Sequence, residues 1–93
     1  LIVSVPEIHM PSPSFQLSPN PVTDILNIKL NSRTARGEIR LLNLYGQEVL
    51  RLLVMNGISN YQLDLTSLPS GYYIAALINE GVILEREKFV LAD

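Results

Sequence analysis

The side chains that could carry out chemistry are few and lie far apart along this chain. His9 is the only histidine, and it lies among Pro6, Pro11 and Pro13 in an irregular N-terminal stretch. A serine nucleophile needs a neighbouring base, most often a histidine, so the position of His9 argues against a hydrolytic triad. The sequence has no cysteine, which excludes a thiol nucleophile, a thiolate metal site and a disulfide.

The closest pair of carboxylates is Glu85 and Glu87. Paired carboxylates serve glycoside hydrolysis, but no aromatic platform for a sugar stands beside this pair in the sequence. In a strand, alternation places Glu85 and Glu87 on one face and Arg86 and Lys88 on the other. We interpret the segment as a solvated edge strand, because charge on both faces is poorly suited to a central position.

The remaining acidic residues and the glycines do not form a known binding motif. Asp24, Asp64 and Glu80 fall in separate turns, so they lack the spacing of a calcium loop. The five glycines are scattered one per turn, and no glycine-rich phosphate loop is present. We therefore expect no catalytic centre, no cofactor and no metal site, and we expect Asp24 to close the turn after Pro21 through its side-chain oxygen.

The four tyrosines divide into two pairs. Tyr61 and Tyr73 fall on the apolar phase of their segments, which predicts that both lie in the core. Tyr45 and Tyr72 could be partly exposed, and they could bind a sugar if the fold brought them together. This leaves an adhesive or carbohydrate-binding accessory domain as an alternative function.

The composition indicates one small β-rich domain. The length of 93 residues suits a single domain. Of these residues, 47% are hydrophobic and only 17% are charged. The formal net charge is −2 and no basic block is present, so we expect no nucleic-acid partner. The longest apolar run, residues 72–78, is far too short to span a membrane.

From Phe15 onward, apolar and polar residues alternate with the period of β-strands. Leu26, Ile28 and Leu30 share one face of the second expected strand, and the third strand could extend to Leu44. The segment 48–54 fits a strand or a helical turn; we favour a strand, with Val49 and Leu52 near the core. The expected strands cover residues 15–17, 26–30, 39–44, 48–54, 61–65, 72–78 and 82–91.

Turn residues separate these strands at intervals typical of a β-sandwich. We expect a hairpin loop at residues 31–37 and turns at residues 45–47, 56–57, 68–71 and 79–81. Both faces of 72–78 are apolar, which predicts a central strand that is covered on both sides. The fold class is therefore all-β: a seven-stranded immunoglobulin-like sandwich without a disulfide, spanning residues 15–93. Residues 1–14 are expected to form a flexible linker.

Four sequence patches, taken in order, closely resemble the C-terminal sorting domain of proteins exported by the type IX (Por) secretion system of Bacteroidetes. The first patch is Ser18-Pro19-Asn20-Pro21 with residues 24–28, and the last is Lys88-Phe89-Val90-Leu91. Between them lie Leu-Tyr-Gly-Gln-Glu-Val at 44–49 and Leu-Pro-Ser-Gly-Tyr-Tyr-Ile at 68–74. The family motif then corresponds to the following residues: Pro19, Asn20, Pro21, Asp24, Leu26, Ile28, Gly46, Gly71 and Tyr73.

The resemblance implies a non-catalytic address that the outer-membrane translocon recognises after export to the periplasm. It also implies a sortase-like peptidase that cleaves within residues 1–14 and joins the parent protein to anionic lipopolysaccharide at the cell surface. We hypothesise that the translocon contacts the terminal strand, an exposed edge open to strand addition. The expected recognition residues are Glu87, Lys88, Phe89, Val90 and Leu91.

Two further interpretations follow from the ends of the chain. The family often finishes with a basic residue, whereas this chain finishes Leu91-Ala92-Asp93, which is compatible with a retained surface scaffold subunit. The exposed edge together with the apolar Leu1-Ile2-Val3 would allow a homodimer by strand exchange.

Overall fold

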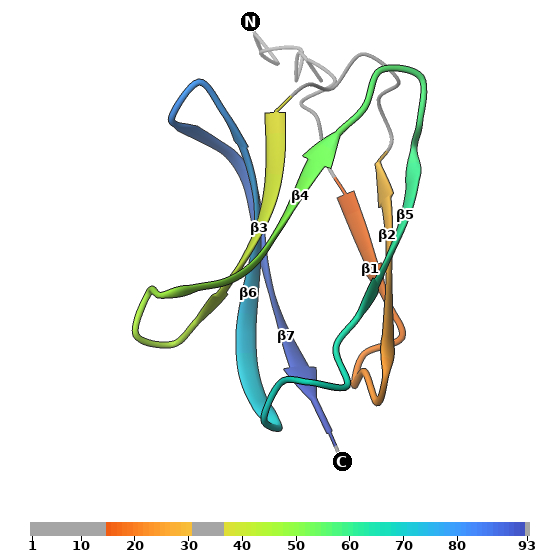
Figure 1. The fold of residues 1–93 in the computed structure, drawn as a ribbon, viewed down its shortest axis with the longest axis vertical. Helices are drawn as coiled ribbons and strands as arrows, with labels where there is room; N and C mark the ends of the chain where they lie inside the picture. The colour runs from red at the N-terminus through yellow and green to blue at the C-terminus, as the bar shows by residue number, and fades with distance from the viewer. Residues whose placement is uncertain (1–14, 31–36, 93) are drawn as a thin grey trace, which may run out of the picture.

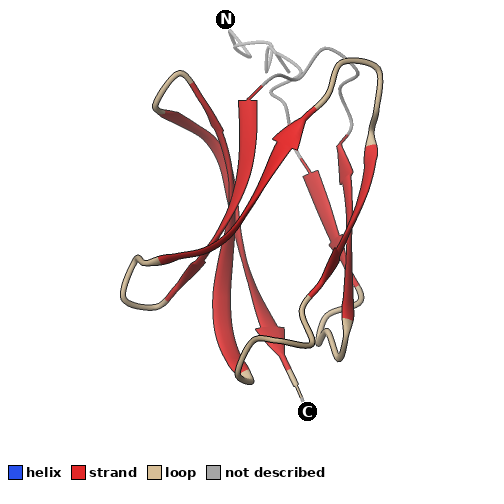
Figure 2. Cartoon of the chain, in the orientation of Figure 1, coloured by secondary structure: helices blue, strands red, loops and turns tan. Residues whose placement is uncertain are grey.

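The computed structural model describes residues 15–30 and 37–92, and all seven expected strands are present in it (Figures 1 and 2). The segment 48–54 is a strand, as expected, with Val49 and Leu52 packed against the core. The strands are β1 Phe15–Ser18, β2 Ile25–Leu30, β3 Gly37–Asn43, β4 Glu48–Val54, β5 Asn60–Asp64, β6 Gly71–Asn79 and β7 Val82–Leu91.

The strands form two facing antiparallel sheets, so the predicted seven-stranded sandwich is confirmed and is consistent with an immunoglobulin-like fold (Figure 1). One sheet has the order β1-β2-β5 and the other the order β4-β3-β6-β7. Alternate side chains from both sheets fill the space between them, which is the ordinary core of a sandwich. The largest fully buried side chains are those of Val22, Leu26, Ile28, Leu30, Ile39, Leu41, Leu65, Leu77 and Phe89.

The hairpin expected across residues 31–37 does not form, because β2 and β3 belong to different sheets. β2 pairs with β1 on one side and β5 on the other, while β3 pairs with β4 and β6. A polar connection of this kind looks the same in sequence whether it joins neighbouring strands or crosses between two sheets. The Asn56-Gly57 turn likewise carries the chain from β4 to β5 in the opposite sheet.

β3 ends one residue before Leu44, whose side chain is exposed in the turn and is not part of the strand. Asn43 ends the strand because its Oδ1 accepts hydrogen bonds from the N–H groups of Tyr45 and Gln47, at 2.9 and 3.0 Å. Such a side-chain acceptor replaces the next ladder partner and turns the chain. Gly46 follows with φ of 81°, a conformation that glycine adopts without steric cost.

β6 is a central strand, as predicted, and β7 is an edge strand that pairs only with β6 among the strands described. The second sheet covers the inner face of β6. On its outer face Ala76 is 1% exposed, and it lies in register with Arg40 of β3 and Arg86 of β7. The predicted cover on both sides is therefore only partial, because on the outer face Ala76 and Ile78 are buried whereas Tyr72 is 50% exposed and Ile74 is only partly buried.

Tyr61 and Tyr73 are buried, as the alternation predicted. The Tyr61 hydroxyl donates to the carbonyl of Ile58 at 3.0 Å and accepts from the N–H of Met55 at 2.8 Å. Tyr73 stacks on Phe89 with ring centroids 5.8 Å apart. Each ring therefore adds apolar area to the core, while its hydroxyl keeps a polar partner.

Candidate functional site: a clip between the proline turn and the terminal strand

The first and last patches of the sequence meet at one end of the sandwich. Val22 forms a parallel bridge with Leu91. The N–H of Val22 donates to the carbonyl of Val90 at 2.8 Å, and the N–H of Ala92 donates to the carbonyl of Val22 at 2.7 Å. Asn20 adds a third contact, because its Oδ1 accepts from the N–H of Val90 at 3.3 Å. We call these five residues the terminal clip.

The local sequence explains which groups of the turn reach β7. Pro19 and Pro21 have no N–H, so the donors left between Ser18 and Thr23 are those of Asn20 and Val22. Both proline peptide bonds, Ser18–Pro19 and Asn20–Pro21, are cis. The turn thus presents the amide side chain of Asn20 and both backbone groups of Val22, its N–H and its carbonyl, to the terminal strand.

Asp24 was predicted to close the turn after Pro21 through its side-chain oxygen; this Oδ1 accepts from the N–H of the adjacent residue, Ile25, at 2.7 Å, so it holds the exit of the turn at the start of β2 and does not bridge it. The Asp24 carbonyl also accepts from the N–H of Leu65 at 2.8 Å, which ties the start of β2 to the end of β5. Val22, between the turn and this anchor, is fully buried. The turn is therefore held by backbone bonds on two sides and by one core side chain.

Most residues of the expected motif lie around the clip or in the core beneath it. Leu26 and Ile28 are buried in β2, and Tyr73 is buried in β6. Gly71 pairs in register with Leu91, at the clip itself. Gly46 lies in the turn between β3 and β4 and forms no part of the clip.

Two of the five expected recognition residues are buried in the core, and the other three are not. Glu87 and Lys88 are exposed and Val90 is partly buried, whereas Phe89 and Leu91 are 1% and 3% exposed. The Lys88 ammonium lies 4.5 Å from the centroid of the Tyr72 ring. On the folded domain the side chains of Glu87, Lys88 and Val90 are at least partly accessible, whereas those of Phe89 and Leu91 pack into the core.

Comparison with protein families gives one decisive match. The family model for the secretion system C-terminal sorting domain matches residues 16–92. The chain belongs to this family. The matched segment begins in β1 and ends at Ala92, so it includes both halves of the clip. A comparison with curated proteins gave no match.

Membership makes the chain a sorting domain of the type IX secretion system, and it implies export through that system to the cell surface or the medium. Sorting domains of this family are non-catalytic in general, and the family implies contact with the secretion machinery. No helix in the described part of the sorting domain is long and apolar enough to cross a membrane.

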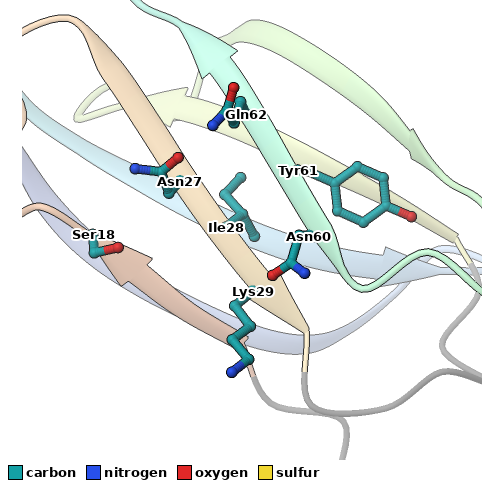
Figure 3. A pocket seen from close by; sticks show the side chains of 7 residues that line it. All are labelled: Ser18, Asn27, Ile28, Lys29, Asn60, Tyr61 and Gln62. Carbon is teal, nitrogen blue, oxygen red and sulfur yellow. The ribbon is translucent and has the colours of Figure 1, made fainter.

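A second surface of the sorting domain, away from the clip, offers hydrogen-bonding groups. A shallow hollow of about 330 Å³ on the β1-β2-β5 sheet is lined by the polar residues Ser18, Asn27, Lys29, Asn60 and Gln62, together with Ile28 and Tyr61 (Figure 3). These side chains include no carboxylate or imidazole. Within residues 15–30 and 37–92, no three metal-ligating side chains lie close enough to hold an ion.

Tyr45 and Tyr72 are 90% and 50% exposed, yet the sorting domain does not pair their rings. The ring contact found among the described residues is that of Tyr73 with Phe89, and Tyr72 lies beside Lys88. A sugar platform needs exposed aromatic faces held side by side, so no observation favours the carbohydrate-binding alternative.

Sequence reasoning missed two members of the clip, Val22 and Ala92. The sequence contained a signal for Val22, because it is an apolar residue directly after Pro21 and, unlike the proline, it has a backbone N–H that can donate. For Ala92 the sequence offered none, because its contribution is a backbone N–H that every residue except proline carries.

Proposed function

We propose that residues 15–93 are a non-catalytic address, recognised by the outer-membrane translocon of the type IX system after export of the parent protein to the periplasm. The clip carries this proposal, because it joins the first and last family patches into one folded feature. An address built this way can be read only when both ends of the domain are in place. Preorganisation of the turn also lowers the ordering cost when a partner binds.

We further propose that residues 1–14 are the linker in which a sortase-like peptidase cleaves, before the parent protein is joined to anionic lipopolysaccharide. The support is the linker composition, with Pro6, Pro11 and Pro13. These residues lie outside the described part of the structure, as does the Leu1-Ile2-Val3 segment considered for strand exchange.

The recognition residues that we propose are those of the terminal strand whose side chains are not buried, Glu87 on one face and Lys88 and Val90 on the other. A deletion of Lys88–Asp93 would be a poor test, because it removes Phe89 and Leu91 from the core together with the clip. Loss of secretion would then follow from unfolding alone. Point variants of exposed side chains separate recognition from folding.

The test is a fusion of residues 1–93 to the C-terminus of a periplasmic reporter in a type IX-competent bacterium, with surface display as the readout. We expect the fusion to reach the surface and the reporter alone to stay in the periplasm. Glu87→Lys with Lys88→Glu should reduce display, while Lys29→Glu on the opposite sheet should not. Retention of the unaltered fusion in the periplasm would refute the proposed function.

A further inference from the structure

The outer edge of β7 is only partly occupied. Val90 directs its N–H and carbonyl away from β6 and into the clip. In an antiparallel strand every second residue points its backbone groups the same way, so Lys88 and Arg86 also direct theirs outward. Within the described residues neither has a backbone partner on that side. We call Glu85–Phe89 the free edge.

The free edge is bounded at both ends. Toward the C-terminus it meets the clip, where Asn20 and Val22 already run beside Val90 and Leu91. Toward the N-terminus the register shifts at Leu77/Ile78, which leaves Leu84 as an extra residue in β7. Such bulges interrupt strand pairing. A short added strand would therefore fit between these two limits.

The outer face of the free edge carries uncompensated positive charge. Arg86 and Lys88 are exposed there, and neither forms an ion pair with a carboxylate of the described residues. On the same face of this sheet, Glu38 of β3 and Glu48 of β4 already have cationic partners. Each forms ion pairs with both Arg40 and Arg51, at 2.9–3.4 Å. This pairing raises the pKa of Arg51, chiefly through the hydrogen bond to Glu48.

A second copy of the chain is a poor occupant of this edge. If two β7 strands paired antiparallel about a twofold axis normal to the sheet, the outer faces of both copies would lie on the same side of the joined sheet. Centred on Glu87, such pairing sets Arg86 of each copy opposite Lys88 of the other. Like charges directly opposite in a sheet are destabilising, so the charge pattern works against this dimer.

We propose that the free edge binds an extended segment of the secretion machinery as an added strand, with acidic side chains at the positions opposite Arg86 and Lys88. Its alternate side chains face Glu85 and Glu87, so they are neutral or basic. Backbone hydrogen bonds supply the affinity of such strand addition, and side-chain complementarity supplies its specificity. The identity of the partner rests on the proposed function; the chemistry of the segment rests on the edge itself.

The test measures binding of the 93-residue chain to a short labelled peptide that alternates glutamate and threonine. Fluorescence anisotropy gives the affinity, and backbone amide NMR shifts locate the contact. The controls are the same peptide with lysine in place of glutamate, and the glutamate peptide with N-methyl groups on alternate amides. Arg86→Glu with Lys88→Glu is the test variant, and Lys29→Glu is the matched control.

We expect the glutamate peptide to bind about tenfold more tightly than the lysine peptide, with shifts at the amides of Arg86 and Lys88. The Arg86/Lys88 variant should reverse this order, Lys29→Glu should preserve it, and N-methylation should abolish binding. The proposal is overturned by equal affinity for both peptides, by unimpaired binding of the N-methylated one, or by a β7-mediated dimer. Binding of anionic lipid vesicles without binding of the peptide overturns it as well.

The same variant in the reporter fusion keeps the two proposals apart. Normal display of the Arg86/Lys88 variant would overturn the acidic-strand proposal while leaving the address function standing. If the unaltered fusion stays in the periplasm, the address function fails, and the peptide measurements still decide what the edge binds.

Discussion

Val22→Ala is the substitution that tests the clip most directly. Val22 is fully buried, and its N–H and carbonyl form two of the three hydrogen bonds to the terminal strand. Alanine keeps both backbone groups and removes two methyl groups from the core. The substitution therefore reports how firmly the turn is packed onto the domain, without deleting a hydrogen bond.

The expected loss in the free energy of unfolding follows from this burial. Each buried methyl group contributes about 0.8 kcal/mol, so two give about 1.6 kcal/mol. The cavity left behind raises the loss to about 2–3 kcal/mol. A domain of this size has a total stability of about 5–14 kcal/mol, so the substitution removes a large share of it. The melting temperature should fall by about 8–24 °C, at about 4–8 °C for each kcal/mol.

Urea unfolding followed by tyrosine fluorescence measures this loss, with an unchanged slope as the check on two-state behaviour. Leu53→Ala is the matched control, because Leu53 is 67% exposed and should cost less than about 0.5 kcal/mol. Combined with Leu91→Ala, Val22→Ala should show a coupling energy above about 0.5 kcal/mol. A loss under about 1 kcal/mol, or additive effects of the two changes, would refute a packed clip.

Two further predictions concern the backbone and the pH dependence. Gly37→Ala should cost about 3 kcal/mol or more, because φ is 126° and the new Cβ would meet the Ile78 carbonyl oxygen and lie 2.9 Å from its carbon. Gly57→Ala, with φ of 83° and no atom within 4 Å, should cost only about 1–2 kcal/mol in the same urea assay; equal losses would contradict the clash. The hydroxyl and N–H of Thr66 lower the pKa of Asp64, so Thr66→Val should raise that pKa in a carboxyl NMR titration. Because the pKa of Asp64 is lower in the folded than in the unfolded state, the ionised carboxylate stabilises the fold at neutral pH, and this contribution is lost as the pH falls through the folded pKa. An unchanged Asp64 pKa in the variant would show that the Thr66 hydroxyl has no effect.

The sequence by itself determined the strands and the role of several of them. Alternation placed Leu26 and Ile28 on a buried face, and the same period identified the core tyrosines Tyr61 and Tyr73. Charge on both faces of 85–88 marked β7 as an edge, because a central strand would bury half of those charges. Side-chain chemistry that repeats every second residue is visible in sequence, so these features could be predicted.

Only the tertiary structure decided which strands are neighbours and how the two ends of the chain meet. The polar residues 31–37 favoured a hairpin, but β2 found partners on both sides within its own sheet. The clip joins Asn20 and Val22 to residues about seventy positions away, largely through backbone N–H and carbonyl groups. Because every residue except proline carries the same backbone donor and acceptor, no residue type marks such a pairing in advance. Both patches can therefore be found in the sequence, whereas the packing of the two sheets decided that they form one feature.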